Sequence, residues 1–212
     1  MSPAAIASTA PAPSNVKRTA PKSSTKPVIT PSSILPQTPS DIVPAWVKPD
    51  LTRLLRVEHV PGDYASRSVS LVDLPAGAVF ARISNPTPAT CAYSSVQASR
   101  DLHIELNCDL VYINHSCQPT LIFDMTHWEI RVSPALEGGL KAGDELTFFY
   151  PSTEWDMAQP FDCRCGQNEC RGKISGAKDM PDVVLRQYWL NRHIEELLLE
   201  KTNSAKGSGD AR

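Results

Sequence analysis

Four of the six cysteines in this 212-residue chain have the pattern of a metal-ligand set. Cys163, Cys165 and Cys170 fall within eight residues that also carry a glycine and polar side chains, which is a poor composition for a buried core segment. A structural zinc ion takes four ligands, and Cys117, in Asn114-His115-Ser116-Cys117, is the expected fourth. Cys91 and Cys108 are the alternatives, although each also suits an apolar core position. Such a site would tie the C-terminal part of the chain to a central Asn-His-Ser loop.

The sequence also bears on the cellular compartment of the protein, and so on the redox state of these thiols. We identify neither the apolar core of a secretory signal near residue 1 nor a run of about eighteen apolar residues that could span a membrane. We therefore expect an intracellular protein, in the nucleus or the cytoplasm, that is neither secreted nor in a membrane. Metal ligation is then favoured over disulfides.

Charge is distributed unevenly along the chain. Residues 1–40 carry four basic residues and no acid, and residues 201–212 carry three basic residues and one acid. The segment between them holds 14 of the 21 basic and 22 of the 23 acidic residues, a net charge of −8. An acidic body of this kind does not suit a phosphate backbone, so no direct nucleic-acid binding is expected. It suits a basic partner such as a lysine-rich peptide.

Local patterns divide the chain into tails, strands and a terminal helix. The Pro/Ser/Thr-rich residues 1–45 are expected to be a disordered tail, and the polar residues 201–212 a second one. Apolar residues recur at helical spacing over 179–200, where Asp179 could cap a helix that Pro181 opens. Short β-branched and aromatic runs predict strands at 69–72, 79–83, 110–113, 128–132 and 146–150.

Three motifs occur in a fixed order: Tyr112-Ile-Asn-His-Ser-Cys-Gln-Pro119, Gly143-Asp-Glu-Leu-Thr-Phe-Phe-Tyr150, and Cys163-Arg-Cys-Gly with Cys170-Arg-Gly172. Together they resemble the SET-domain protein lysine methyltransferases that carry a post-SET zinc motif, over roughly residues 64–172. The resemblance implies a mainly β fold with short helices, a SET-domain β-fold in which the Asn-His loop threads beneath a C-terminal segment in a pseudoknot. The helical spacing over 179–200 adds a C-terminal amphipathic helix. The resemblance places the SET domain at 50–152 and the post-SET zinc segment at 153–176.

The resemblance also implies roles for individual residues. S-adenosylmethionine would bind on one face, and a protein substrate with an exposed lysine, histone or non-histone, would enter from the other through a narrow channel. A phenylalanine at position 148 implies room for di- or trimethylation. The implied roles are cofactor binding for Asn114, His115 and Tyr150, catalysis for Tyr150, lining of the substrate channel for Tyr112 and Phe148, and zinc binding for Cys117, Cys163, Cys165 and Cys170.

One part of the family pattern is missing. The glycine-rich turn that lets the cofactor approach the backbone is replaced by residues 64–69, which contain no glycine. Ser66 and Arg67 of this loop would then be the residues that face the cofactor. Two hypotheses stay open: an active lysine methyltransferase, and a SET-like module that binds a peptide without transferring methyl groups.

Overall fold

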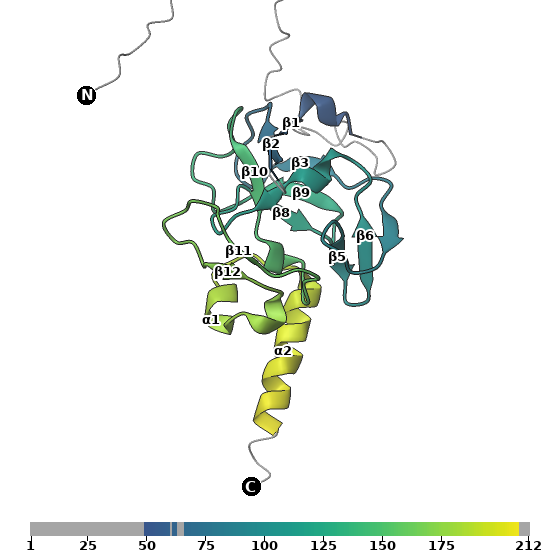
Figure 1. Ribbon diagram of the computed structural model, residues 1–212, viewed down its shortest axis with the longest axis vertical. Coiled ribbons are helices and arrows are strands. Elements are labelled where there is room, and N and C mark those ends of the chain that lie inside the picture. The colour runs from purple at the N-terminus through teal and green to yellow at the C-terminus, as the bar shows by residue number, and fades with distance from the viewer. Residues whose placement is uncertain (1–48, 60, 63–65, 208–212) are drawn as a thin grey trace, which may run out of the picture.

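The computed structural model describes residues 49–59, 61–62 and 66–207 (Figure 1). The tail expected over residues 1–45 lies outside the described residues, as do residues 63–65 of the glycine-free loop and residues 208–212. No helix among the described residues is long and apolar enough to cross a membrane.

In the described part of the chain, short strands form four small sheets, so the fold is mainly β, as expected. The largest sheet has the order β1-β2-β10-β7, and the others have the orders β3-β9-β8, β4-β6-β5 and β11-β12. The strands are β1 Leu55–Glu58, β2 Arg67–Ser70, β3 Val79–Arg82, β4 Thr87–Ala89, β5 Val96–Ser99, β6 Leu102–Glu105, β7 Asn114–His115, β8 Leu121–Asp124, β9 Glu129–Val132, β10 Glu145–Phe148, β11 Phe161–Asp162 and β12 Lys173–Ile174.

The pairing of β7 with β10 places the Asn-His loop at the centre of the molecule. The two strands run parallel, with Asn114 opposite Thr147 and His115 opposite Phe148. A parallel pair requires a crossover connection, and here the connection carries the hairpin β8–β9. The chain after β10 then returns past the loop, which gives the SET-like arrangement that the motifs predicted.

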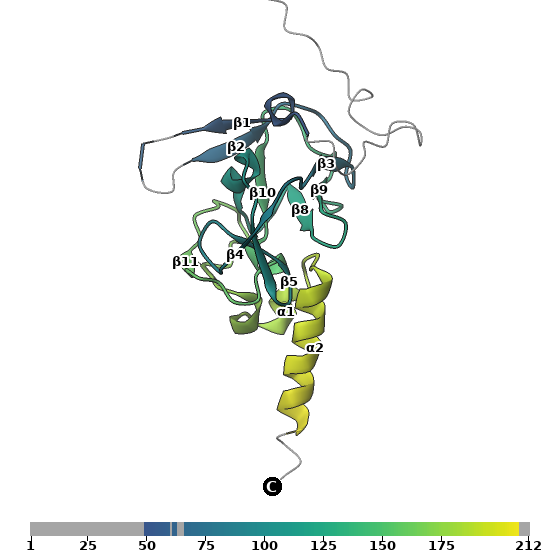
Figure 2. The same cartoon turned by 90° about the vertical axis from the view of Figure 1, so that its right-hand side faces the viewer.

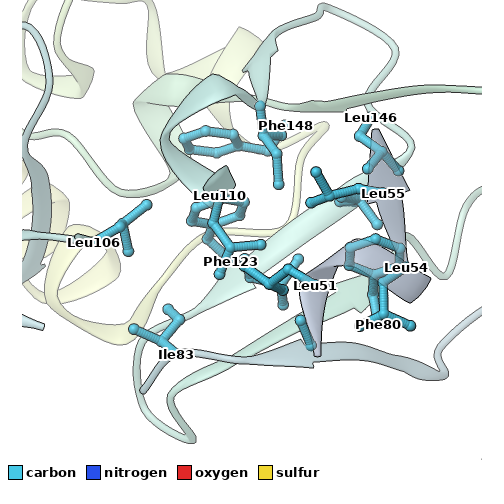
Figure 3. Close-up of a cluster of buried hydrophobic side chains, with 14 of the residues drawn as sticks. Leu51, Leu54, Leu55, Phe80, Ile83, Leu106, Leu110, Phe123, Leu146 and Phe148 are labelled. Carbon is cyan, nitrogen blue, oxygen red and sulfur yellow. The ribbon is translucent and has the colours of Figure 1, made fainter. Parts of the chain in front are cut away.

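Two clusters of buried apolar side chains hold these layers together. The larger cluster joins the sheets and includes Phe80, Phe123 and Phe148, with the rings of Phe123 and Phe148 stacked at 3.9 Å (Figure 3). The smaller cluster lies under the C-terminal segment, and there the ring of Phe149 stacks on Tyr188 at 3.6 Å. Successive residues at the end of β10 therefore contribute to different cores.

The strand expected over residues 110–113 is wrong. Asp109–Tyr112 forms a 3₁₀ helix, η4, in which Leu110 is buried while Val111 and Tyr112 are each 37% exposed. A short apolar run is compatible with either structure, and here one helical turn lets Leu110 and Ile113, three residues apart, both be buried. The strand expected at 146–150 ends at Phe148, because Tyr150–Ser152 forms a second 3₁₀ helix, η5, with Pro151 in its first turn.

The single helix expected over 179–200 is also wrong. The segment forms a 3₁₀ turn η6 (Ala177–Asp179), a short helix α1 (Asp182–Leu185) and a longer helix α2 (Arg192–Gly207). Asp179 belongs to η6 and does not cap α1. The tail expected at 201–212 is helical as far as Gly207, and α2 projects away from the sheets (Figure 2).

Buried hydrogen bonds of Asn191 explain the break between α1 and α2. Its side-chain amide donates to the carbonyls of Phe123 and Ser152 at 2.8 and 2.9 Å, and its side-chain oxygen accepts the Met125 N–H at 2.9 Å. These three bonds fix the start of α2 against β8 and η5.

Candidate functional site

The structure brings the sulfurs of Cys117, Cys163, Cys165 and Cys170 together. All four Sγ atoms lie within 4.8 Å of one another, and the Cys117 and Cys163 sulfurs are 3.9 Å apart. A tetrahedral zinc ion with Zn–S distances of about 2.3 Å holds its sulfurs about 3.8 Å apart, so the cluster fits zinc with small adjustments. The rival cysteines, Cys91 and Cys108, are not part of the cluster.

A short hairpin positions three of these cysteines. β11 and β12 pair on either side of them, and the Cys163 N–H donates to the Gly172 carbonyl at 2.7 Å. The fourth, Cys117, follows β7, and its sulfur accepts the Arg171 N–H at 3.3 Å. Burial raises the pKa of the Cys117 thiol to about 11, and a bound dication would offset that cost by stabilising the thiolate.

His115 lies between this cluster and Tyr150. Its Nδ1 accepts the Tyr150 N–H at 3.2 Å, and its Nε2 lies 3.4 Å from the Cys117 sulfur. Burial lowers the pKa of His115 to about 4, so the ring is neutral at pH 7. Because Nδ1 is the acceptor, the ring hydrogen is on Nε2 and points at the sulfur. His115 therefore connects the cysteine cluster to the backbone of Tyr150.

Asn114 fastens the opposite side of the loop. Its side-chain amide donates to the Ser66 carbonyl at 2.7 Å, and the Ser68 hydroxyl donates to the Tyr112 carbonyl at 3.0 Å. The glycine-free segment that leads into β2 is therefore held directly against the Asn-His loop.

Tyr150 is packed among aromatic rings. Its ring centroid lies 4.7 Å from Phe148, 5.3 Å from His115 and 6.0 Å from Phe161. Its hydroxyl lies 3.4 Å from the Ile113 carbonyl, a long contact. Burial, followed by the charge of Glu154, raises the pKa of the Tyr150 phenol above its ordinary value, so the hydroxyl stays protonated and can accept or donate a hydrogen bond.

A cavity of about 1070 Å³ joins these residues, a volume at the upper end of the range for ligand pockets. Asn114, His115, Phe148 and Tyr150 all line it. Charged residues on its wall are mostly acidic, so the cavity suits cationic ligands. The charged lining residues are Asp144, Glu145, Glu154, Asp162 and Arg164.

Three of the residues expected at the site are placed differently. Tyr112 and Arg67 are not among the described residues that line the cavity. The Tyr112 ring lies edge-on to His59 at 5.6 Å, and the Arg67 guanidinium pairs with Glu58 at 2.8 Å. Ser66 meets Asn114 through its carbonyl.

Glu154 is the lining residue that the sequence reasoning missed. It follows Tyr150 by four residues, and its N–H donates to the Tyr150 carbonyl at 3.1 Å. That spacing is the signal in the sequence that could have pointed to it.

Comparisons with known proteins point to methyltransferases. No protein-family model matches the chain. Methyltransferase flvH of Aspergillus flavus is 50% identical over 163 residues, which cover 76% of this chain and 90% of flvH. The histone-lysine N-methyltransferase ASHH2 of Arabidopsis thaliana is 34% identical over 98 residues, 45% of this chain and 6% of ASHH2. The histone-lysine N-methyltransferase ash1 of Drosophila melanogaster is 29% identical over 86 residues, 37% of this chain and 4% of ash1.

The fold, the site and the partial similarity to histone-lysine methyltransferases define a SET-like methyltransferase. The chain belongs to the same methyltransferase family as flvH, which it matches over nearly the whole length of that protein.

Proposed function

We propose that this protein is an S-adenosylmethionine-dependent protein-lysine N-methyltransferase with a structural zinc ion. The observation that carries the proposal is the hydrogen bond between the Tyr150 N–H and His115 Nδ1, which brings the Asn-His loop and the tyrosine to one acidic cavity. Its SET-domain part corresponds to residues 50–152 and its post-SET zinc segment to residues 153–176.

The cavity fits the cofactor in size and charge. S-adenosylmethionine, when bound, supplies a methyl group on a positively charged sulfur, and four acidic residues line the cavity against one arginine. Asn114 and His115 would hold its amino-acid and adenine parts. Cys117, Cys163, Cys165 and Cys170 would hold zinc, which fixes the C-terminal segment over the loop.

The aromatic wall suits an amine acceptor. A lysine of pKa about 10.4 is neutral in only about one molecule in a thousand at pH 7.4, which costs roughly 4 kcal/mol. Phe148, Tyr150 and Phe161 desolvate the amine and so favour its neutral form. The Tyr150 hydroxyl and the Ile113 carbonyl would orient the nitrogen and favour the electron-poor methyl group in the transition state.

The substrate is proposed to be a protein with an exposed lysine. The relatives ASHH2 and ash1 are named for histone lysines, so histones are natural candidates, and non-histone proteins with basic segments suit the acidic cavity equally. The nucleus and the cytoplasm are both compatible with these substrates. Phe148, which lies in the cavity wall, favours repeated methylation.

A specific observation supports the alternative of a peptide-binding module. The Asn114 amide is already bonded to the Ser66 carbonyl, and residues 64–69 lack the glycines that would let a cofactor approach the backbone. A module of this kind would bind basic peptides without binding S-adenosylmethionine.

Calorimetry with S-adenosylmethionine separates the two functions. The enzyme is expected to bind it with a dissociation constant below the millimolar range, and Asn114→Ala is expected to weaken binding at least tenfold. Asn203→Ala, exposed on α2, is the matched control and should bind like the wild type. Absence of heat at millimolar cofactor, together with binding of a lysine-rich peptide, would establish the module instead.

A further inference from the structure

Glu154 is a buried carboxylic acid in the wall of the cavity that Tyr150 lines. Glu154 is 8% exposed, and its backbone N–H donates to the carbonyl of Tyr150, four residues earlier in the chain, at 3.1 Å. Burying a charged carboxylate costs free energy unless the group is hydrogen-bonded or becomes neutral, so the contacts of Glu154 determine its charge.

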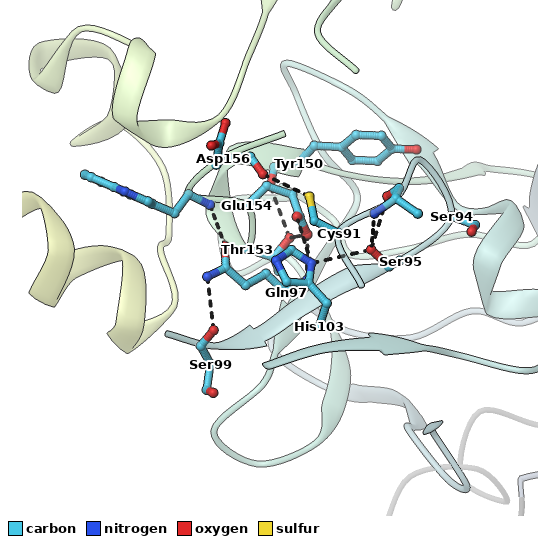
Figure 4. A network of polar contacts seen from close by, with 12 residues as sticks. Cys91, Ser94, Ser95, Gln97, Ser99, His103, Tyr150, Thr153, Glu154 and Asp156 are labelled. Atoms are coloured by element: carbon cyan, nitrogen blue, oxygen red, sulfur yellow. Dashed lines mark hydrogen bonds and ion pairs between the residues drawn. The ribbon is translucent and has the colours of Figure 1, made fainter. Parts of the chain in front are cut away.

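The two carboxyl oxygens of Glu154 have different surroundings (Figure 4). Oε1 accepts the Gln97 N–H at 2.7 Å and the Thr153 hydroxyl at 3.1 Å. Among the described residues, Oε2 approaches the Nδ1 atom of His103 at 3.8 Å, which is too long for a hydrogen bond. One oxygen is therefore fixed to β5, and the other has no hydrogen bond among the described residues, although Glu154 is part of the cavity wall.

The titratable neighbours of Glu154 do not neutralise it. His103 on β6 is kept neutral by burial, which lowers its pKa, and burial lowers the pKa of His193 on α2 as well. Cys91 and Tyr150, the other neighbours that its charge affects, are neutral acids whose pKa values burial raises, and Asp156 is two residues further along the chain. Neither a lysine nor an arginine forms an ion pair with Glu154 in the described part of the chain.

Burial raises the pKa of the Glu154 carboxyl to about 7, against the lowering effect of the Gln97 N–H and the Thr153 hydroxyl. A carboxyl of this kind exchanges a proton readily near neutral pH, which is the property of an effective general base. The charge of Glu154 also raises the pKa of Tyr150, so the two groups lie within electrostatic range of each other.

We propose that Glu154 is a catalytic residue that binds the ammonium group of the acceptor amine in this cavity and accepts its proton before methyl transfer. This inference rests on the proposed methyltransferase function. It assigns to a side chain of the protein the deprotonation that every lysine acceptor must undergo, whereas Tyr150, a protonated phenol, cannot remove the proton.

The step balances in atoms and charge. The ammonium group transfers one proton to the Glu154 carboxylate, which leaves a neutral amine and a neutral carboxylic acid. The amine nitrogen then forms a bond to the methyl carbon while the carbon–sulfur bond breaks, and its electron pair goes to sulfur. The positive charge passes from sulfur to the methylated nitrogen, and Glu154 later releases its proton to water.

The test is the pH dependence of kcat/KM for wild type and Glu154→Gln, with a lysine-containing peptide as acceptor. The amide oxygen of glutamine can still accept the Gln97 N–H, so the substitution removes the base and keeps the anchor. Wild type is expected to rise to a plateau above pH about 7. Glu154→Gln is expected to lose about 10²-fold at pH 7.5, and to rise about tenfold per pH unit toward the amine pKa of about 10.4.

Gln97→Ala is the control for a purely structural role. The Gln97 side-chain oxygen accepts the Trp155 N–H at 2.8 Å. Its truncation therefore loosens the contact between β5 and the segment that carries Glu154, while the Glu154 carboxyl stays in place. The pH dependence of kcat/KM for Gln97→Ala should keep the wild-type shape, even where the values themselves are lower. A Glu154→Gln profile that is a scaled copy of the wild-type profile overturns the inference alone. A wild-type protein that binds no cofactor and transfers no methyl group overturns the proposed function, and the inference falls with it.

Discussion

The backbone N–H of Tyr150 donates to Nδ1 of His115 at 3.2 Å, and the other ring nitrogen of that histidine faces the sulfur of Cys117 at 3.4 Å. One imidazole thus connects the four-cysteine cluster to the residue proposed to act on the substrate. Because the same ring contacts both groups, we expect a change at the Cys117 sulfur to alter the position of Tyr150.

The cysteine cluster predicts one zinc ion per chain. Elemental analysis of the purified protein should give a stoichiometry near one, and Cys165→Ser should lower it to near zero, because three sulfurs do not close a structural site. Cys91→Ser removes an exposed cysteine outside the cluster and should leave the zinc content unchanged. Equal loss of zinc in both variants would argue against the assigned ligand set.

His115→Ala should destabilise the protein and its metal site together. The Tyr150 N–H loses its acceptor, which costs about 1–3 kcal/mol for a buried donor, and the Cys117 sulfur loses its contact with Nε2. We expect a lower thermal midpoint and faster zinc transfer to a chelating dye. His127→Ala is the control, since that side chain is 66% exposed and contacts Asp124 rather than a cysteine. An unchanged rate of zinc release in His115→Ala would contradict the proposed link between His115 and the cysteine cluster.

Glu154 should make stability depend on pH. Its pKa of about 7 in the folded state is above that of an unfolded glutamate, so the folded protein binds the extra proton and its advantage is lost as pH rises toward 7. Between pH 5.5 and 8, the unfolding free energy of wild type relative to Glu154→Gln should fall by about 2 kcal/mol. Denaturant unfolding of both proteins across this range measures it, and a pH-independent difference would show that the carboxyl is not protonated as described.

The smaller core predicts which face of α2 matters. Ile194 is fully buried, so Ile194→Ala should cost about 2–4 kcal/mol of unfolding free energy. Leu199, five residues further on, is 61% exposed, and Leu199→Ala should change stability by less than about 0.5 kcal/mol. Denaturant titration of both variants tests the orientation of the helix. Similar losses of unfolding free energy would mean that Leu199 is buried, which contradicts its exposed position on α2.

The sequence predicted the parts of the site that depend on closely spaced motifs. The Cys163-x-Cys165 pair and the Asn114-His115 pair are local in the sequence. The pairing of β7 with β10 brings Asn114 and His115 close to Tyr150, and the cysteine pair meets Cys117. The mainly β fold followed from the same motifs and is confirmed. Their roles toward a cofactor and a metal ion stay predictions.

The sequence failed where a distant contact decides the local structure. The helix break before α2 depends on Asn191, whose partners Phe123, Met125 and Ser152 lie on other elements. Tyr112 belongs to a 3₁₀ turn that directs its ring to His59. No pattern in the sequence records either contact.

The central claim is tested most directly by following a labelled methyl group from S-adenosylmethionine. The protein is incubated with labelled cofactor and with core histones or a whole-cell lysate, and acid hydrolysis then identifies the amino acid that carries the label. We predict label in di- or trimethyllysine with wild type, and loss of at least 10²-fold with Tyr150→Phe, which should still bind the cofactor. Label in no protein, or in a residue other than lysine, would contradict the account.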